Sequence, residues 1–245
     1  MEERAVLDLP EKIAQKKNMR FVICIDEFQK IHEFKDGLFL QQRLRSHWQM
    51  QKRTSYCLYG SKRHIITQLF ESQDQPFYRF GDLVFLGKIG EEHWFSFLKK
   101  QFESTGKHID HDLISRILKL TSNHPYHIQQ LAHYLWRLTD HKASLKLLQA
   151  SLDELILNNE ILFRKELENV TPLQLGFLEA LLNGEKHMTS AEVIQKYKLG
   201  SSGNLGTIKA ALESKEIIDF FETEPVFVNP VFEYWLREYF FGAHA

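Results

Sequence analysis

Residues 21–28 read FVICIDEF, an unbroken run of five apolar side chains that ends in the acidic pair Asp26 and Glu27. A continuous apolar run of this length is typical of a strand buried on both faces, as in a parallel α/β sheet. Open α/β sheets bind ligands at the carboxyl ends of their strands, which is where both carboxylates would lie. The same residues also fit a plain buried strand followed by an N-capping aspartate and a first-turn glutamate.

The pattern of the first ninety residues alternates between helices and strands. Helical spacing of apolar residues or short strand-like runs predict, in chain order, a helix at 2–17, a strand at 20–26, a helix at 38–50, a strand at 55–59, a helix at 62–71 and a strand at 82–86. This alternation predicts a parallel sheet with right-handed crossover helices.

After Gly90 the pattern becomes helical, and near Thr171 it changes again. Two helices, a Gly/Ser-rich loop, a third helix and a hairpin follow, which is the order of a winged helix. The fold class expected is therefore α/β followed by all-α and winged helix. Three domains are predicted: a partial nucleotidase core at 1–90, a helical lid at 91–168, and a winged-helix domain with a C-terminal helix at 169–245.

The composition is that of an ordinary globular protein. The 245 residues are 43% hydrophobic and 26% charged, and the net charge of −1 gives no general attraction to nucleic acid or membrane. No signal peptide and no run of membrane-spanning length is present, so a cytoplasmic location is expected. Cys24 and Cys57 lie within apolar runs, which predicts buried, reduced thiols.

Four stretches give the chain a resemblance to the prokaryotic STAND-type ATPases of the AAA+ division, the archaeal-type ATPases. Residues 22–30 (VICIDEFQK) look like their Walker B strand, and LYGS at 58–61 with PFYR at 76–79 looks like their sensor-1 strand and following loop. NHPYHIQ at 123–129 resembles their lid motif, and VNPVFEYWL at 228–236 resembles the signature after their winged helix. The resemblance covers nearly the whole chain and implies a P-loop nucleotidase.

The resemblance assigns roles at the carboxyl ends of the strands. Asp26 would hold Mg²⁺ through water, and Glu27 would orient or activate the water that attacks ATP. Ser61 would be the sensor-1 group near the γ-phosphate, although it also fits a strand-end cap.

The resemblance assigns further groups to ATP. Arg79, or alternatively Lys62 or Arg63, would place a cation on phosphate oxygens, because guanidinium suits phosphate; each also fits a solvated basic loop. Pro125 would pack on the adenine ring, with Tyr126 beside it in the lid motif. Read without the family, Pro125 is a helix-starting proline. ATP and Mg²⁺ are thus the cofactors implied.

The departures from the family concern the phosphate loop. No GxxxxGK[ST] sequence is present, since the two Gly-Lys pairs, at 87–88 and 106–107, lack the flanking residues. The expectation is that about the first third of a family member lies outside this sequence and that the chain alone binds ATP weakly or not at all. The strands at 55–59 and 82–86 would lose their shared neighbour, leaving an apolar edge open. Asn123 replaces a lid glycine and, as an asparagine, tolerates left-handed backbone.

Three histidines, His124, His127 and His133, raise the question of a metal site, but no acid completes a ligand set in the sequence. The winged helix raises the question of DNA binding, yet residues 171–245 carry six basic and ten acidic side chains.

Three functions are therefore compared. The first is an ATP-dependent switch whose isolated C-terminal portion is inactive. The second is a non-catalytic protein-interaction module, either degenerate or half of a split ATPase, whose partner is a protein or the missing P-loop segment. The third is a DNA binder.

Overall fold

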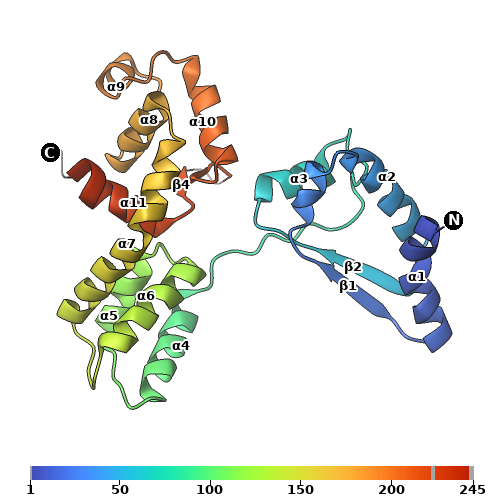
Figure 1. Ribbon diagram of the computed structural model, residues 1–245, viewed down its shortest axis with the longest axis horizontal. Helices are drawn as coiled ribbons and strands as arrows, with labels where there is room; N and C mark the ends of the chain where they lie inside the picture. The colour runs from blue at the N-terminus through green and yellow to red at the C-terminus, as the bar shows by residue number, and fades with distance from the viewer. Residues whose placement is uncertain (1, 222–223, 243–245) are drawn as a thin grey trace. The chain divides into compact units, whose positions relative to one another are not determined.

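A pair of parallel strands forms the sheet of the N-terminal part. The computed structural model describes residues 2–221 and 224–242. β1 (Phe21–Ile25) pairs in parallel with β2 (Thr54–Leu58), in a register that aligns Phe21 with Thr54 and Ile25 with Leu58 (Figure 1). The chain crosses between them through η1 (Phe28–Glu33) and α2 (Gly37–Trp48). The prediction of two parallel strands joined by a helical crossover is confirmed.

The prediction of a third strand at 82–86 is wrong. This segment has no regular structure, and the side chains of Val84 and Leu86 are 78% and 81% exposed. A strand persists only where a neighbour pairs with its backbone groups. In the part of the chain that the structure describes, β1 and β2 pair with each other and neither borders residues 82–86.

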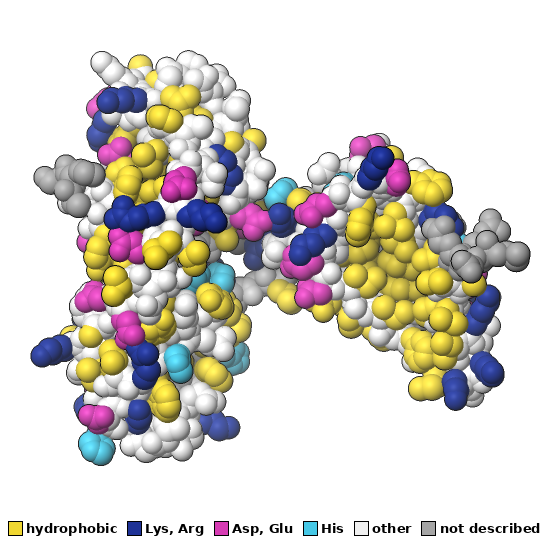
Figure 2. Space-filling view, in the orientation of Figure 1, with side chains coloured by type: hydrophobic (Ala, Val, Ile, Leu, Met, Phe, Trp, Pro, Cys, Tyr) yellow, Lys and Arg dark blue, Asp and Glu magenta, His cyan; other side chains and the backbone are white. Residues whose placement is uncertain are grey.

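One face of the two-stranded sheet is open. Burial alternates along both strands, so Ile23 and Tyr56 are partly covered whereas Val22 is 70% exposed. Cys24 and Cys57 are also exposed, so the predictions of burial on both faces and of buried thiols are wrong. Figure 2 shows a broad hydrophobic area on the strand-bearing side of this unit. The continuous apolar sequence of β1 is typical of a strand buried on both faces, yet one of its faces is open here.

An aromatic cluster covers the other face. Phe28 and Phe77 meet edge to face with ring centroids 5.5 Å apart, and Trp48 stacks on Tyr56 at 4.0 Å. Such pairs add stabilisation beyond their buried area. The buried members of this small core are Phe28, Ile31, Trp48, Leu69, Phe70 and Phe77, drawn from η1, α2, α3 (Arg63–Glu71) and the loop that follows it.

The helix α1 (Glu2–Lys17) is held on the sheet by one buried carboxylate. Glu11 accepts hydrogen bonds from the backbone N–H groups of Lys52 and Arg53, at 3.2 and 3.0 Å, and from the hydroxyl of Thr54 at 3.1 Å. Burial raises the pKa of Glu11, but these hydrogen bonds outweigh it, so the pKa lies below its usual value.

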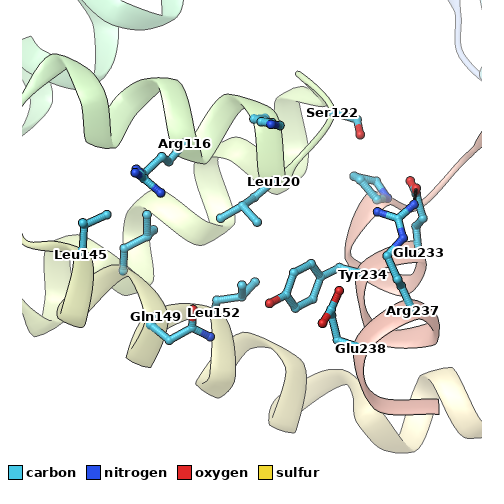
Figure 3. Close-up of a pocket in the computed structure, with 13 residues that line it drawn as sticks. Arg116, Leu120, Ser122, Leu145, Gln149, Leu152, Glu233, Tyr234, Arg237 and Glu238 are labelled. Atoms are coloured by element: carbon cyan, nitrogen blue, oxygen red, sulfur yellow. Dashed lines mark hydrogen bonds and ion pairs between the residues drawn. The ribbon is translucent and has the colours of Figure 1, made fainter. Parts of the chain in front are cut away.

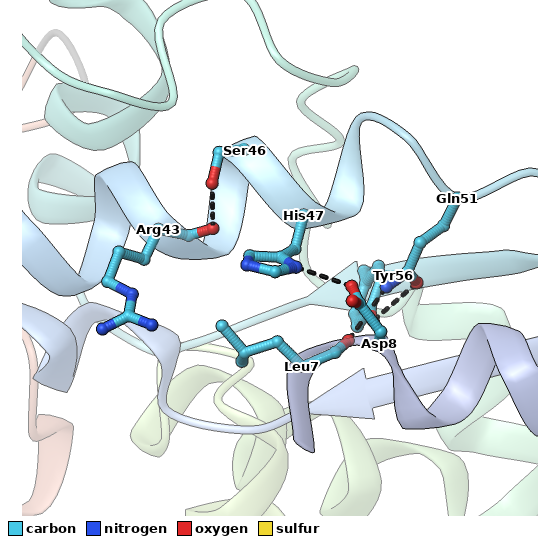
Figure 4. Close-up of polar contacts among 7 residues, drawn as sticks. All are labelled: Leu7, Asp8, Arg43, Ser46, His47, Gln51 and Tyr56. Carbon is cyan, nitrogen blue, oxygen red and sulfur yellow. Dashed lines mark hydrogen bonds and ion pairs between the residues drawn. The ribbon is translucent and has the colours of Figure 1, made fainter. Parts of the chain in front are cut away.

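Neighbouring contacts reinforce this attachment (Figure 4). The Nδ1 atom of His47 lies 2.6 Å from a carboxylate oxygen of Asp8, and Gln51 donates to the carbonyl of Leu7 at 3.0 Å. The Gln51 side chain also accepts from the hydroxyl of Tyr56. The turn before β2 is therefore built around α1.

The chain divides into two compact parts, Met1–Leu86 and Gly87–Ala245. Helices dominate the second part. Its elements are α4 (Glu91–Glu103), α5 (His111–Leu120), α6 (Pro125–Leu138), α7 (Leu145–Glu168), α8 (Pro172–Leu182), α9 (Ala191–Lys196), α10 (Asn204–Ser214), β3 (Ile218–Asp219), β4 (Val226–Phe227), α11 (Pro230–Trp235) and η2 (Leu236–Phe241). One hydrophobic core runs from Trp94 to Leu236.

Local signals in the sequence set several of these helix starts. Thr171 and Gln174 form a reciprocal capping box at the start of α8, with Pro172 in its first turn, and Pro125 opens α6. The antiparallel pair β3–β4 follows α10, so the predicted order of three helices and a hairpin is present. Residues 222 and 223 of that hairpin lie outside the described residues. The boundary between a lid and a winged helix stays a prediction.

Within the described ranges, no helix is both long enough and apolar enough to cross a membrane.

Replacing Glu11 by glutamine is expected to reduce the stability of the N-terminal unit at pH 7. The lowered pKa means that the carboxylate stabilises the fold above about pH 4.5 and that this contribution is lost as pH falls through the folded-state value. The difference in urea midpoint between wild type and Glu11→Gln should therefore be full at pH 7 and shrink below pH 4.5. Glu71→Gln, at an exposed site, is the control. A difference that does not change with pH would contradict this role.

Candidate functional site

The acidic pair lies at the carboxyl end of β1, as predicted. Asp26 is exposed and accepts a hydrogen bond from the backbone N–H of Glu27 at 2.8 Å. Glu27 has left-handed backbone, with φ of 52°, and Phe28 then donates to the carbonyl of Tyr59 at 3.0 Å. The turn that carries the two carboxylates is thereby bound to the segment that follows β2, next to Gly60.

A buried amide holds Glu27. Gln29 is 1% exposed, and its Nε2 donates to a carboxylate oxygen of Glu27 at 2.8 Å. A Cβ at Gly60 would lie 1.7 Å from the Gln29 Oε1 atom, so the absence of a side chain at Gly60 makes room for this amide. Sequence reasoning missed Gln29, and the glycine directly after a strand was the one signal available.

The remaining predicted groups of this unit are spread over two loops. Ser61 is exposed just after β2, and therefore lies at the same sheet edge as Asp26, because the strands are parallel. Arg79 has φ of 52° and its guanidinium lies over the ring of Tyr78, 5.1 Å from the centroid. None of the contacts described joins Arg79 to either acid.

Arg45 fixes the loop that carries Arg79. It donates to the carbonyls of Pro76 and, at 2.9 Å, Tyr78, and its guanidinium lies over the ring of Phe80 at 5.3 Å. The predictions did not include Arg45, whose role depends on a contact across thirty residues of sequence.

The lid turn belongs to the second unit and is described by itself. Ser122 and Asn123 both have left-handed backbone, with φ of 47° and 58°, which confirms that asparagine is accommodated there. Lys88 donates to the Ser122 carbonyl and Asn123 to the Ile89 carbonyl, each at 2.8 Å. Two consecutive non-glycine residues in this conformation carry backbone strain, which is common at ligand-binding turns.

After this turn, α6 starts at Pro125 and presents Tyr126, which is 63% exposed. Its aromatic ring is accessible for stacking on a flat ligand.

Two imidazoles lie beside this turn, that of His127 buried and that of His124 half-buried. The rings of His124 and His127 are 4.8 Å apart. Burial lowers the pKa of His127 to about 4, assisted by the charge that His124 would carry, and burial followed by Lys88 lowers that of His124. Both rings are therefore neutral at pH 7. The Nδ1 atoms of both and the Oδ1 of Asn123 lack hydrogen-bond partners.

Buried polar atoms without partners are uncommon in folded proteins. These three atoms lie on successive residues or one helical turn apart, and all three are buried. No group of three or more His, Cys, Asp or Glu side chains that could hold a metal ion gathers within the described ranges.

The second unit also contains a cavity of about 550 Å³ between α5, α7 and α11 (Figure 3). Leu152 and Leu120 supply apolar walls, and Arg116, Gln149 and Tyr234 point toward the space. Burial raises the pKa of Tyr234. No predicted site residue lines this cavity.

Comparison with solved structures finds the same fold in an ATPase. A Walker-type ATPase of Pyrococcus abyssi matches 96% of this chain and 67% of its own length, with a TM-score of 0.70 and 17% sequence identity. At that identity the likeness shows the fold alone: the chain has the fold of the corresponding part of a Walker-type ATPase.

A more distant match is the ORC1 protein of Aeropyrum pernix in complex with DNA, at 12% identity. It covers 95% of this chain and 68% of its own, and its TM-score of 0.44 is too low to carry an argument. No protein-family model and no curated protein matches the chain.

Replacing Gly60 by alanine is expected to destabilise the N-terminal unit by about 1–3 kcal/mol, because the new Cβ displaces the Gln29 amide. Gly81→Ala in the same unit is the matched control, since no atom lies within 4 Å of the Cβ it would add. Urea unfolding followed by tryptophan fluorescence, to which Trp48 of this unit contributes, measures both. Equal midpoints for the two variants would show that the contact between Gln29 and Gly60 carries no stability.

His127 is expected to make the second unit sensitive to mild acid. Its pKa is lowered from 6.5 to about 4, so the unfolded chain binds a proton first and stability is lost progressively between those values. His127→Gln should flatten this part of the pH profile of the urea midpoint. His133→Gln, at an exposed position of the same helix, should leave it unchanged. An NMR titration of His127 with a pKa near 6.5 would contradict the assignment.

Proposed function

We propose that this chain is the portion of a STAND-type AAA+ ATPase that runs from Walker B to the C-terminus, and that it acts in an ATP-dependent molecular switch. One observation carries the proposal. Parallel pairing brings Asp26, Glu27 and Ser61 to one sheet edge, whereas residues 82–86 form no strand within the described ranges. A strand and phosphate loop supplied by another segment would complete this arrangement. The fold likeness to a Walker-type ATPase, of which a third has no counterpart here, supports it.

The acidic edge would serve the metal and the attacking water. Asp26 is an exposed carboxylate, the kind of ligand through which Mg²⁺ is held with waters and phosphate oxygens. Glu27, fixed by Gln29, would orient water, and Ser61 and Arg79 would face the γ-phosphate. Bound Mg²⁺ would neutralise phosphate charge. The chain's own residues thus fit the metal side of the site, but the glycine-rich phosphate cradle is not among them.

The lid turn would receive the base of the nucleotide. Pro125 and Tyr126 would pack on the adenine ring, and the Tyr126 side chain is 63% exposed. Exchange of ATP for ADP would then shift the second unit, and with it the proposed winged helix, relative to the first. We place this switch in the cytoplasm.

A non-catalytic interaction module is the second candidate. The open apolar face of β1 and β2 favours it, because large exposed patches mark contact surfaces. Its partner would be a protein. DNA binding is disfavoured, since the three-helix and hairpin segment is acidic and its third helix, α10, carries one lysine, Lys209, that lies over the ring of Phe220.

Calorimetry with Mg-ATP tests the proposal. Residues 1–245 alone are expected to show no micromolar binding. Addition of a separately produced segment that carries GxxxxGK[ST] and its strand, taken from the reading frame upstream, should restore binding. Asp26→Asn should weaken that restored binding about tenfold or more, whereas Asp82→Asn should not.

Two outcomes would count against the switch. Micromolar binding by residues 1–245 alone would show that the chain is complete for nucleotide. Binding of the segment without any gain of nucleotide affinity would favour the interaction module.

A further inference from the structure

The two cysteines of the chain lie side by side on the open face of the sheet. Cys24 of β1 and Cys57 of β2 are aligned partners in the parallel register, and both are exposed and free. Aligned residues of neighbouring strands project to the same face. Adjacent strands are about 4.8 Å apart, which falls within the Cα separation that disulfides span.

We propose that Cys24 and Cys57 form a redox-active thiol pair that a hydroperoxide oxidises to an intramolecular disulfide. In the first step one thiolate attacks a peroxide oxygen, which breaks the O–O bond and leaves a sulfenic acid and, for hydrogen peroxide, water. In the second step the other thiol attacks that sulfenic sulfur and releases a second water. Both sulfurs are oxidised, and the peroxide is reduced by the two electrons they lose.

The exposure of both thiols argues against a purely structural role for these cysteines. A buried cysteine acts as a small hydrophobic side chain and is inert, whereas these thiols are both accessible to a solute oxidant. A thiol oxidised to sulfenic acid is rescued from further oxidation when a second thiol can reach it. The strand register supplies that second thiol without any backbone rearrangement, since both residues are fixed in regular structure.

The position of the pair connects it to the acidic edge. Asp26 follows Cys24 by two residues and Tyr59 follows Cys57 by two residues, so strand alternation places them on the same face as the cysteines. The Asp26 carboxylate raises the pKa of Tyr59, as do both cysteines, in keeping with this grouping. A disulfide would therefore lock β1 to β2 directly behind Asp26.

Oxidation of the reduced 245-residue protein with hydrogen peroxide tests the pair. The expected product is a monomer about 2 Da lighter with no thiol that reacts with Ellman's reagent. Its rate of formation should not depend on protein concentration. Cys24→Ser and Cys57→Ser, each conservative at an exposed position, should lose their remaining thiol about tenfold more slowly than the wild type or give only intermolecular dimers.

A second measurement detects proximity even if the disulfide forms slowly. Phenylarsine oxide bridges two neighbouring thiols, so it should protect both cysteines of the wild type at one equivalent and protect neither single variant against competing monothiol. The same protection should fall at least about tenfold in urea, where the register is lost. Independent reaction of the two thiols, in both measurements, would overturn the proposal. Because neither measurement involves nucleotide, this result is separate from the fate of the proposed ATPase role.

Discussion

The structure of the N-terminal unit depends on the backbone pairing of its parallel strands. Backbone N–H and C=O groups must find partners, and a parallel sheet ordinarily satisfies them with a strand on each side and helices on both faces. β1 and β2 have one another and one covered face. Residues 82–86 follow an irregular path, Val22 is exposed and both thiols are accessible, as expected for strands that have one neighbour and one covered face.

Both polar and apolar contacts stabilise this two-stranded sheet. The Glu11 carboxylate accepts hydrogen bonds from the backbone N–H groups of the turn that leads into β2. A side chain of α1 thus links this helix to β2. On the same covered face, Trp48 stacks on Tyr56 and packs against Phe77. The aromatic cluster thus stabilises the covered face, and the Glu11 carboxylate attaches α1 together with the contacts of His47 and Gln51.

Local signals made much of the fold predictable. The apolar run before Asp26, the proline that opens α6 and the capping box at Thr171 each act within one turn of chain, and each element begins where these signals put it. Strand pairing at 82–86 failed because it depends on a neighbour rather than on the segment's own residues. Periodicity cannot show whether an apolar run has a partner or a cover.

The candidate sites were predicted unevenly for the same reason. Asp26 and Ser61 could be placed, because a parallel sheet brings the carboxyl ends of its strands together. The amide of Gln29 against Gly60, and the guanidinium of Arg45 on the loop before Arg79, depend on contacts between residues far apart in sequence. The partnerless imidazoles of the lid turn are visible only once burial is known.

Contacts on both sides of Gly87 fix the segment that links the two compact parts. Before Gly87 the carbonyl of Leu86 accepts from Arg63 at 3.4 Å, and after it Lys88 and the carbonyl of Ile89 are bound to the lid turn. A Cβ at Gly87 would meet no atom within 4 Å. Each part therefore holds its own end of the linking segment by hydrogen bonds within that part, and those of the second part are made to the backbone-strained turn at Ser122 and Asn123.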